Sequence, residues 1–189
     1  MGLKRIDGTL RETRKKERQD IEGFGREMDR MNLKIREAET RDGQDIARLN
    51  QEDLGYEYSI QGTREKLEQV LSSGKDKVFV AVMEEDGEER LSGRTLEKAA
   101  FVVGYIHACD YDVLYCPHLK NIMGIAVSSE YRGRGIGRAL LEQVELWAKE
   151  SGAIGVRLVS GAGRTGAHEF YRRCGYTGGK EQINFKKIF

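Results

Sequence analysis

The strongest structural signal in the chain lies in residues 121–138, which read Asn-Ile-Met-Gly-Ile-Ala-Val-Ser-Ser-Glu-Tyr-Arg-Gly-Arg-Gly-Ile-Gly-Arg. An apolar run ends at Val127, and a glycine-rich loop then leads directly into an amphipathic segment. The first amide groups of a helix have no partner within the helix, and the helix dipole adds positive potential at that end. Glycine lets the backbone turn sharply and approach an anion closely. The stretch therefore predicts a strand, a phosphate-binding loop and a helix.

The remaining sequence predicts one α/β (α+β) domain over residues 31–189. Apolar residues that alternate or run together indicate strands, whereas apolar residues three or four positions apart indicate helices. We expect strands at 33–38, 78–83, 99–108, 122–127 and 153–160, helices at 43–53, 62–72, 136–151 and 165–174, and one or two edge strands within 176–189. Residues 84–98 and 110–120 are expected to be exposed connections. The predicted order is β-αα-βββ-α-β-α-β, a mixed sheet flanked by helices.

Residues 1–30 form a separate, highly charged extension with nine Lys/Arg and seven Asp/Glu. Its only helical stripe is late, at Ile21, Phe24, Met28 and Met31, and nearby glycines weaken it. The extension can pack on the domain or on a second subunit, which leaves a homodimer open.

Composition excludes several classes of function. The chain has 189 residues and a formal net charge of +1, so no strongly basic face for nucleic acid is expected. No apolar stretch approaches the roughly 20 residues that span a bilayer, and no signal-peptide core is present. The cysteines are three in number, an odd count without a disulfide pattern. We expect a cytoplasmic protein with no nucleic-acid or membrane partner.

Two common nucleotide-binding motifs do not fit the glycine loop. A dinucleotide fingerprint needs glycine at its first, third and sixth positions, but the sixth position is Arg138 when counting starts at Gly133 and Leu140 when it starts at Gly135. A Walker loop needs Gly-Lys followed by Ser or Thr, which the stretch lacks. The pattern that remains is Arg132-x-x-Gly135-x-Gly137 between a strand and a helix.

This pattern resembles motif A of the GCN5-related N-acetyltransferase (GNAT) superfamily, through Arg132-Gly-Arg-Gly-Ile-Gly-Arg-Ala-Leu. A second stretch, Ala167-His-Glu-Phe-Tyr-Arg-Arg-Cys-Gly-Tyr176, is similar to motif B of the same family. The resemblance covers roughly residues 32–189 and includes the order of the predicted elements. It implies the GNAT fold, an acetyltransferase activity and acetyl-CoA as cosubstrate, with no metal.

The resemblance also implies a set of cofactor contacts. In this family the loop amides bind the pyrophosphate of coenzyme A, and pantetheine bonds to the exposed edge of the preceding strand. The matching positions are Ile125, Ala126, Val127, Arg132, Gly133, Arg134, Gly135, Ile136, Gly137, Arg138, Arg164, Ala167, His168 and Phe170. Arg164 stands where many members have asparagine, and an arginine at this position can contact the CoA pyrophosphate or the adenosine phosphate instead.

The implied reaction is direct attack of a neutral primary amine on acetyl-CoA. Tyr171 matches the tyrosine that protonates the leaving thiolate in the family, and its reference pKa of about 10 keeps it protonated at neutral pH. The alternative is that Tyr171 belongs only to the core, because Ala167, Phe170 and Cys174 share its stripe. The general base is left open among His107, Asp110, Asp112, Glu130 and His118.

The acceptor amine is the least determined part of the prediction. An acidic group of residues, Glu52, Asp53, Glu57 and Asp110, favours a cationic small-molecule amine. A protein or peptide amine and a non-catalytic acyl-CoA sensor are the alternatives. His107, Cys109, Cys116 and His118 have pairwise spacings that do not suit zinc.

Overall fold

The computed structural model describes residues 32–92 and 95–189, and its centre is a five-stranded sheet in the order β1-β2-β3-β4-β5. The strands are β1 (Leu33–Glu37), β2 (Asp76–Ser92), β3 (Thr95–Val113), β4 (Cys116–Val127) and β5 (Val156–Leu158). The first four strands pair antiparallel, and β5 runs parallel to β4. The predicted N-terminal extension lies outside the described residues.

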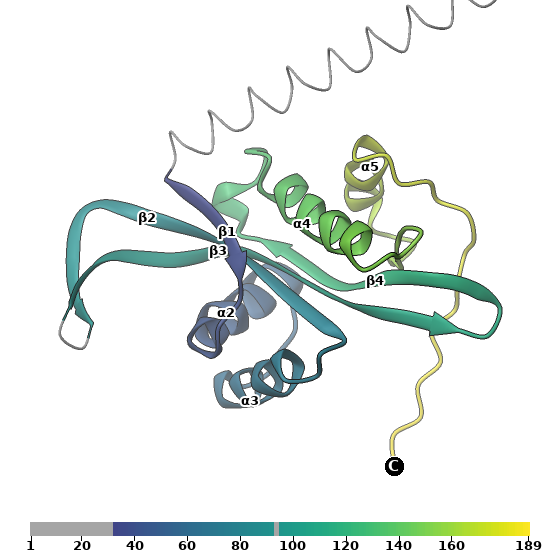
Figure 1. Cartoon of the computed structure of the whole chain (residues 1–189), viewed down its shortest axis with the longest axis horizontal. Coiled ribbons are helices and arrows are strands. Elements are labelled where there is room, and N and C mark those ends of the chain that lie inside the picture. Colours follow the sequence, from purple (N-terminus) through teal and green to yellow (C-terminus); the bar gives the residue numbers. More distant parts are fainter. Residues whose placement is uncertain (1–31, 93–94) are drawn as a thin grey trace, which may run out of the picture.

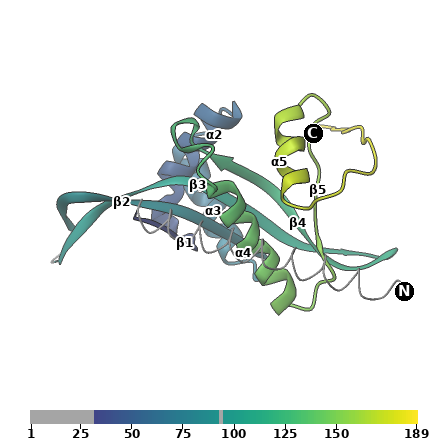
Figure 2. The same ribbon diagram turned by 90° about the horizontal axis from the view of Figure 1, so that it is seen from above.

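Helices cover both faces of this sheet. They are α2 (Gly43–Leu54), α3 (Ile60–Leu71), α4 (Ile136–Glu150) and α5 (Thr165–Arg173), with short 3-10 turns η1 (Thr40–Asp42) and η2 (Ser129–Tyr131). Figure 1 shows α4 and α5 above the sheet and α2 and α3 below it, and Figure 2 shows α4 and α5 from above. None of the helices in the described part of the chain is long and apolar enough to cross a membrane. The predicted mixed α+β fold is confirmed.

Two apolar cores hold the layers together, one on each face of the sheet. On the α4 side, Ile106 of β3 packs with Leu140 and Val144 of α4. On the α2–α3 side, the neighbouring Tyr105 packs with Leu49 and Leu67, and Ala126 of β4 lies in the same cluster. Successive strand residues point to opposite faces, so β3 and β4 serve both cores. Burial of each large apolar side chain stabilises the fold by about 1.5–3 kcal/mol.

The long hairpins differ from the prediction. Residues 84–92 and 95–98 are strand rather than an open connection, and β3 and β4 continue to a tight turn at Leu114 and Tyr115. Ladder pairs such as Asp110↔Lys120 and Tyr111↔Leu119 extend this hairpin through residues whose polarity suggested a loop. Pro117 lies where the pairing register between β3 and β4 shifts. A proline has no N–H to donate to a ladder, so it fits at such an irregularity.

The predicted strand in residues 176–189 is wrong, and β5 is shorter than expected. No regular secondary structure follows α5, and β5 pairs only with β4. The alternating apolar side chains of this segment have no partner surface: Ile183, Phe185 and Phe189 are 81%, 88% and 103% exposed. A strand needs a paired neighbour to satisfy its backbone groups, so alternation alone does not produce one here.

Candidate active site at the fork between β4 and β5

The centre of the candidate site is a gap that opens between β4 and β5. The two strands pair over only three positions, of which Ile122↔Leu158 is the last. Immediately beyond it, His107 of β3 faces Gly124 while Ala108 faces Ile122, so Met123 is an extra residue in β4. Such a bulge bends a strand and increases its twist. β4 then continues to Val127 with no strand on its β5 side among the described residues; we call this gap the fork.

The glycine-rich loop lies at the open end of the fork. Gly133 and Gly135 have φ values of +78° and +79°, which a residue with a Cβ adopts only at a cost. α4 begins at Ile136, and the amide of Ala139 makes a hydrogen bond of 3.1 Å to the carbonyl of Gly135. The amides before Ala139 therefore have no helical partner and face the loop side of α4. This is the arrangement that binds a phosphate group.

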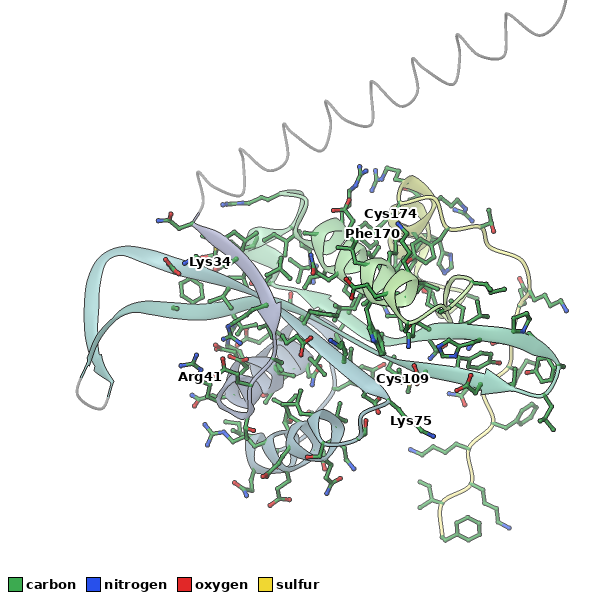
Figure 3. The ribbon with its side chains drawn as sticks, viewed as in Figure 1. Lys34, Arg41, Lys75, Cys109, Phe170 and Cys174 are labelled. Carbon is green, nitrogen blue, oxygen red and sulfur yellow. The ribbon has the colours of Figure 1, made fainter. Side chains whose placement is uncertain are left out.

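Gly137 joins the two sequence motifs in space. A Cβ built on Gly137 would lie 3.1 Å from the ring of Phe170 and 3.8 Å from Cγ2 of Val127. α5 therefore packs directly against the first turn of α4, which in turn contacts the end of β4. Figure 3 shows Phe170 and Cys174 together at α5, close to α4. Phe170 thus supports the loop, whatever contact it makes with a cofactor.

Arg132 points back toward the fold. Its Nε donates to the carbonyl of Val127 at 3.0 Å, and its Nη2 donates to Asp53 at 2.7 Å. Asp53 also accepts from the amide of Ser129 at 2.9 Å, and its side chain is only 4% exposed. These four residues, which we call the Asp53 clamp, tie the end of α2 to the exit of β4 and to the loop. Sequence reasoning assigned Asp53 to the acceptor, because nothing local indicates a partner 79 residues away.

The other predicted arginines occupy the surface around the loop. Arg134 lies over the ring of Tyr131, with its guanidinium carbon 5.3 Å from the ring centroid. Arg138 donates to Glu142 one turn along α4, at 3.0 Å. Arg164 occupies the N-cap position of α5. They surround the loop with positive charge, which is favourable for an anion.

Tyr171 lies in the half-buried layer between α5 and the sheet. Its ring centroid is 5.3 Å from that of Phe170 and 6.0 Å from that of Tyr176. Burial raises the pKa of Tyr171 above its ordinary value near 10, the nearby Arg164 opposes the shift, and Cys174 adds to it. The phenol is therefore neutral at physiological pH and able to donate a proton.

Tyr171 and His168 also line a cavity of about 1230 Å³ between β5, α5 and the C-terminal segment. The ring of His168 is held by the carbonyl of Gly161 at 3.0 Å. No residue of the 132–138 loop lines this cavity. The cavity is therefore separate from the loop end of the fork, and it exists where the C-terminal segment stands away from β5.

Of the five candidates for a general base, only His107 lies opposite the bulge. It faces Gly124 across the ladder, and its Nε2 lies 2.9 Å from Oδ1 of Asp76. Asp76 is held in turn by the hydroxyl of Ser73 at 2.5 Å. A carboxylate only accepts, so this contact places the proton of His107 on Nε2 and leaves Nδ1 as the acceptor.

The remaining candidates lie elsewhere. Asp110 pairs with the buried Lys120, and His118 contacts Asp112 at 2.7 Å, all toward the β3–β4 turn. Glu130 belongs to η2 and is exposed. The two histidines thus use different carboxylates, and within residues 32–92 and 95–189 no group of three or more potential ligands could hold a metal ion.

The carboxylates that suggested a cationic acceptor are mostly paired with cations. Glu52 contacts Arg48 at 3.3 Å, Asp53 belongs to the clamp, and Asp110 pairs with Lys120. A paired carboxylate contributes little additional attraction for a second cation. The structure therefore weakens the argument for an acidic acceptor site.

Comparison with known proteins identifies the class to which this fold and loop belong. The model of the acetyltransferase (GNAT) family matches residues 43–176, which contain the loop, the fork and α5. The chain belongs to this family.

Individual relatives are more distant. The streptothricin acetyltransferase of Escherichia coli is 33% identical over 69 residues, which are 36% of this chain and 40% of that protein. Such curated relatives are thus matched over less than half of their length. An aminoglycoside N-acetyltransferase, AAC(6')-Iy in complex with CoA, has a TM-score of 0.65 at 18% identity, over 82% of this chain and 94% of that one. A transcriptional regulator from Bacillus halodurans has a TM-score of 0.66 at 20% identity, over 82% and 99%. At these identities, the structural likeness concerns the fold alone.

Proposed function

We propose that the protein is an N-acetyltransferase that moves the acetyl group of acetyl-CoA to a primary amine by direct attack. The observation that carries the proposal is the placement of the glycine loop at the open end of the fork. One end of an extended thioester would meet free helix amides there, while its body would meet the unpaired edge of β4. Family membership supports the same reading.

The residues of the chain then have distinct roles. Backbone amides from Arg132 to Arg138 bind the pyrophosphate, and Ile125, Ala126 and Val127 bond to pantetheine and polarise the thioester carbonyl. The amine nitrogen forms a bond to the carbonyl carbon, and the C–S bond breaks. His107 takes the proton that the amine loses, directly or through water, and Tyr171 gives a proton to the departing thiolate. Arg164, Ala167 and His168 flank the cofactor from α5.

A small-molecule amine is the acceptor class that the relatives favour, since one is named a streptothricin acetyltransferase and another an aminoglycoside N-acetyltransferase. A protein or peptide amine is the alternative within the same reaction. The free cysteines at 109, 116 and 174 suit the reducing cytoplasm, where we place the enzyme.

The experiment is release of free CoA thiol from acetyl-CoA when amines are added. A panel of small amines, amino acids and peptides identifies the acceptor, and Tyr171→Phe tests the acid. Binding of CoA without thiol release from any amine would instead support the second candidate, a non-catalytic acyl-CoA sensor. That candidate is favoured only by the regulator that shares the fold.

A further inference from the structure

A row of polar residues crosses four strands and ends at the fork. Asp76 pairs with Cys109, Cys109 with Asn121, and Asn121 with Arg157, so one row runs from β2 to β5. Val156 and Leu158 pack into the core on the α4 side. Because successive strand residues alternate, Arg157 between them points to the opposite face, the face that carries α2 and α3.

Arg157 is held in place by neutral neighbours. Its Nη1 donates to Oδ1 of Asn121 at 2.6 Å, and its guanidinium carbon lies 4.1 Å above the centroid of the Tyr111 ring. These contacts fix the plane of the guanidinium and occupy one of its five N–H groups with a hydrogen bond. No carboxylate in residues 32–84 and 100–189 forms an ion pair with it. Arg36, Arg48, Arg132 and Arg138 have carboxylate partners, whereas Arg157, like Arg64, bonds to a neutral amide.

The position of Arg157 is as informative as its pairing. It precedes Leu158, the last β5 residue paired with β4, so its backbone lies beside the closed end of the fork, and its guanidinium lies over Tyr111. In the proposed reaction the cofactor enters from the α4 end, and the thioester reaches this closed end. The amine must then approach from the other face, where Arg157, Asn121 and His107 lie.

We propose that Arg157 binds an anionic group of the acceptor, so that the substrate is an amine that also carries a carboxylate or a phosphate. This inference rests on the proposed function and narrows its acceptor class. A guanidinium fixed by stacking presents parallel N–H groups that match the two oxygens of a carboxylate or phosphate. The attacking nitrogen and the anion are then separated by only a few bonds, as in an amino acid or an aminoalkyl phosphate.

The test compares matched acceptors that differ only in the anion. Amino acids are assayed beside their methyl esters, and O-phosphoethanolamine beside ethanolamine, with spermidine and an aminoglycoside as cationic amines. The wild type should turn over one of the two anionic classes with at least about tenfold higher kcat/KM than its neutral counterpart, and the preferred pair identifies carboxylate or phosphate as the anion.

Three variants separate binding from folding. Arg157→Gln should raise KM for the anionic acceptor about 10- to 100-fold, and change KM for the neutral counterpart and for acetyl-CoA by less than about threefold. Arg157→Lys keeps the charge without the planar donors, so its KM for the anionic acceptor should lie between those of the wild type and Arg157→Gln. Arg41→Gln is the matched control, because that exposed arginine lies in η1 and pairs with Glu39. Circular dichroism of each variant checks its folding.

The outcomes are distinguishable. Preference for spermidine, the aminoglycoside or the neutral esters overturns this inference but leaves the proposed acetyl transfer standing. If both Arg157 variants lose equal kcat/KM for anionic and neutral acceptors, the arginine has a structural role. That result also overturns this inference. If no amine of any kind releases thiol, the proposed function fails, and the inference fails with it.

Discussion

The Asp53 clamp should control the affinity of the protein for coenzyme A, although Asp53 belongs to α2 and not to the glycine loop. We consider Asp53→Asn, which keeps the shape of the side chain and removes its charge. In the native protein this carboxylate accepts from Arg132 at 2.7 Å and from the amide of Ser129 at 2.9 Å. Both donors reach the same oxygen, Oδ1, so the carboxamide oxygen can still accept both bonds, but it has lost the negative charge that strengthens them.

The free-energy cost of Asp53→Asn follows from how far the side chains of Asp53 and Arg132 are buried. The Asp53 side chain is 4% exposed, whereas that of Arg132 is 56% exposed and loses part of its interaction to solvent. A hydrogen bond to a charged group contributes about 1.5–3 kcal/mol, and an exposed ion pair contributes at most about 1 kcal/mol. We therefore expect a cost of about 1–2 kcal/mol. If this cost destabilises the loop conformation that binds the cofactor, the dissociation constant for CoA rises about 5- to 30-fold.

The assay is calorimetric titration of CoA into the wild type and the variant, followed by KM for acetyl-CoA. Glu52→Gln is the matched control: it is the preceding residue, its partner Arg48 is 3.3 Å away, and its side chain is 60% exposed. We expect that control to change binding by less than about 0.5 kcal/mol. Arg132→Met completes a double-mutant cycle, in which the two losses should be less than additive by about 1 kcal/mol.

Two results would refute this reasoning. One is a dissociation constant for CoA in Asp53→Asn within about twofold of that of Glu52→Gln. The other is full additivity of the Asp53 and Arg132 substitutions, because additive sites do not act through one another. A lower melting temperature with unchanged CoA affinity would mean that the clamp stabilises the fold without positioning the loop.

Three further predictions concern the loop, the acid and the core. Gly135→Ala forces a Cβ into φ +79° at a cost of about 1–2 kcal/mol and should weaken CoA binding in titrations, whereas Gly166→Ala, with open space around it, should not. Tyr171→Phe should lower kcat about 100-fold. Because burial raises the Tyr171 pKa, the wild-type rate should lose its acid only above about pH 10, and the variant should lack that decline in a pH–rate profile. Burial raises the pKa of Tyr105 to about 12, so its contribution to stability is complete below about pH 10 and is lost as the pH rises to about 12. Urea unfolding should show up to about 3 kcal/mol of that loss in the wild type, and Tyr105→Phe should remove it. Equal alkaline losses in both proteins would contradict this assignment.

The part of the site that could be predicted from sequence is the part built by local rules. The strand, loop and helix of residues 122–150 follow from an apolar run, glycines and a helical stripe that lie together in the chain. Gly137 and Phe170 come from separate motifs, and they meet because each motif has a fixed place on its own helix.

The rest depends on contacts between distant segments. Arg132 looked like a phosphate ligand, yet its guanidinium bonds to Asp53, and no periodicity in the sequence encodes that pair. Residues 176–189 were expected to add an edge strand, but this segment pairs with no strand of the sheet, and its apolar side chains Ile183, Phe185 and Phe189 stay exposed. The row that leads to Arg157 exists only because three ladder registers and one bulge align residues of four strands.

Pairing, rather than the count of charges, decides which charged residues remain able to bind a substrate. By count, the acceptor side looked acidic, because four carboxylates were visible in the sequence and their partners were not. In the structure Glu52, Asp53 and Asp110 each have a cation in contact, so their fields are largely neutralised at the distance of a ligand. Among the residues whose side chains the structure describes, Arg157 contacts the Asn121 amide and the Tyr111 ring, both neutral, so its charge stays available. The acceptor that we propose for Arg157 therefore carries an anion, which reverses the preference that the sequence suggested.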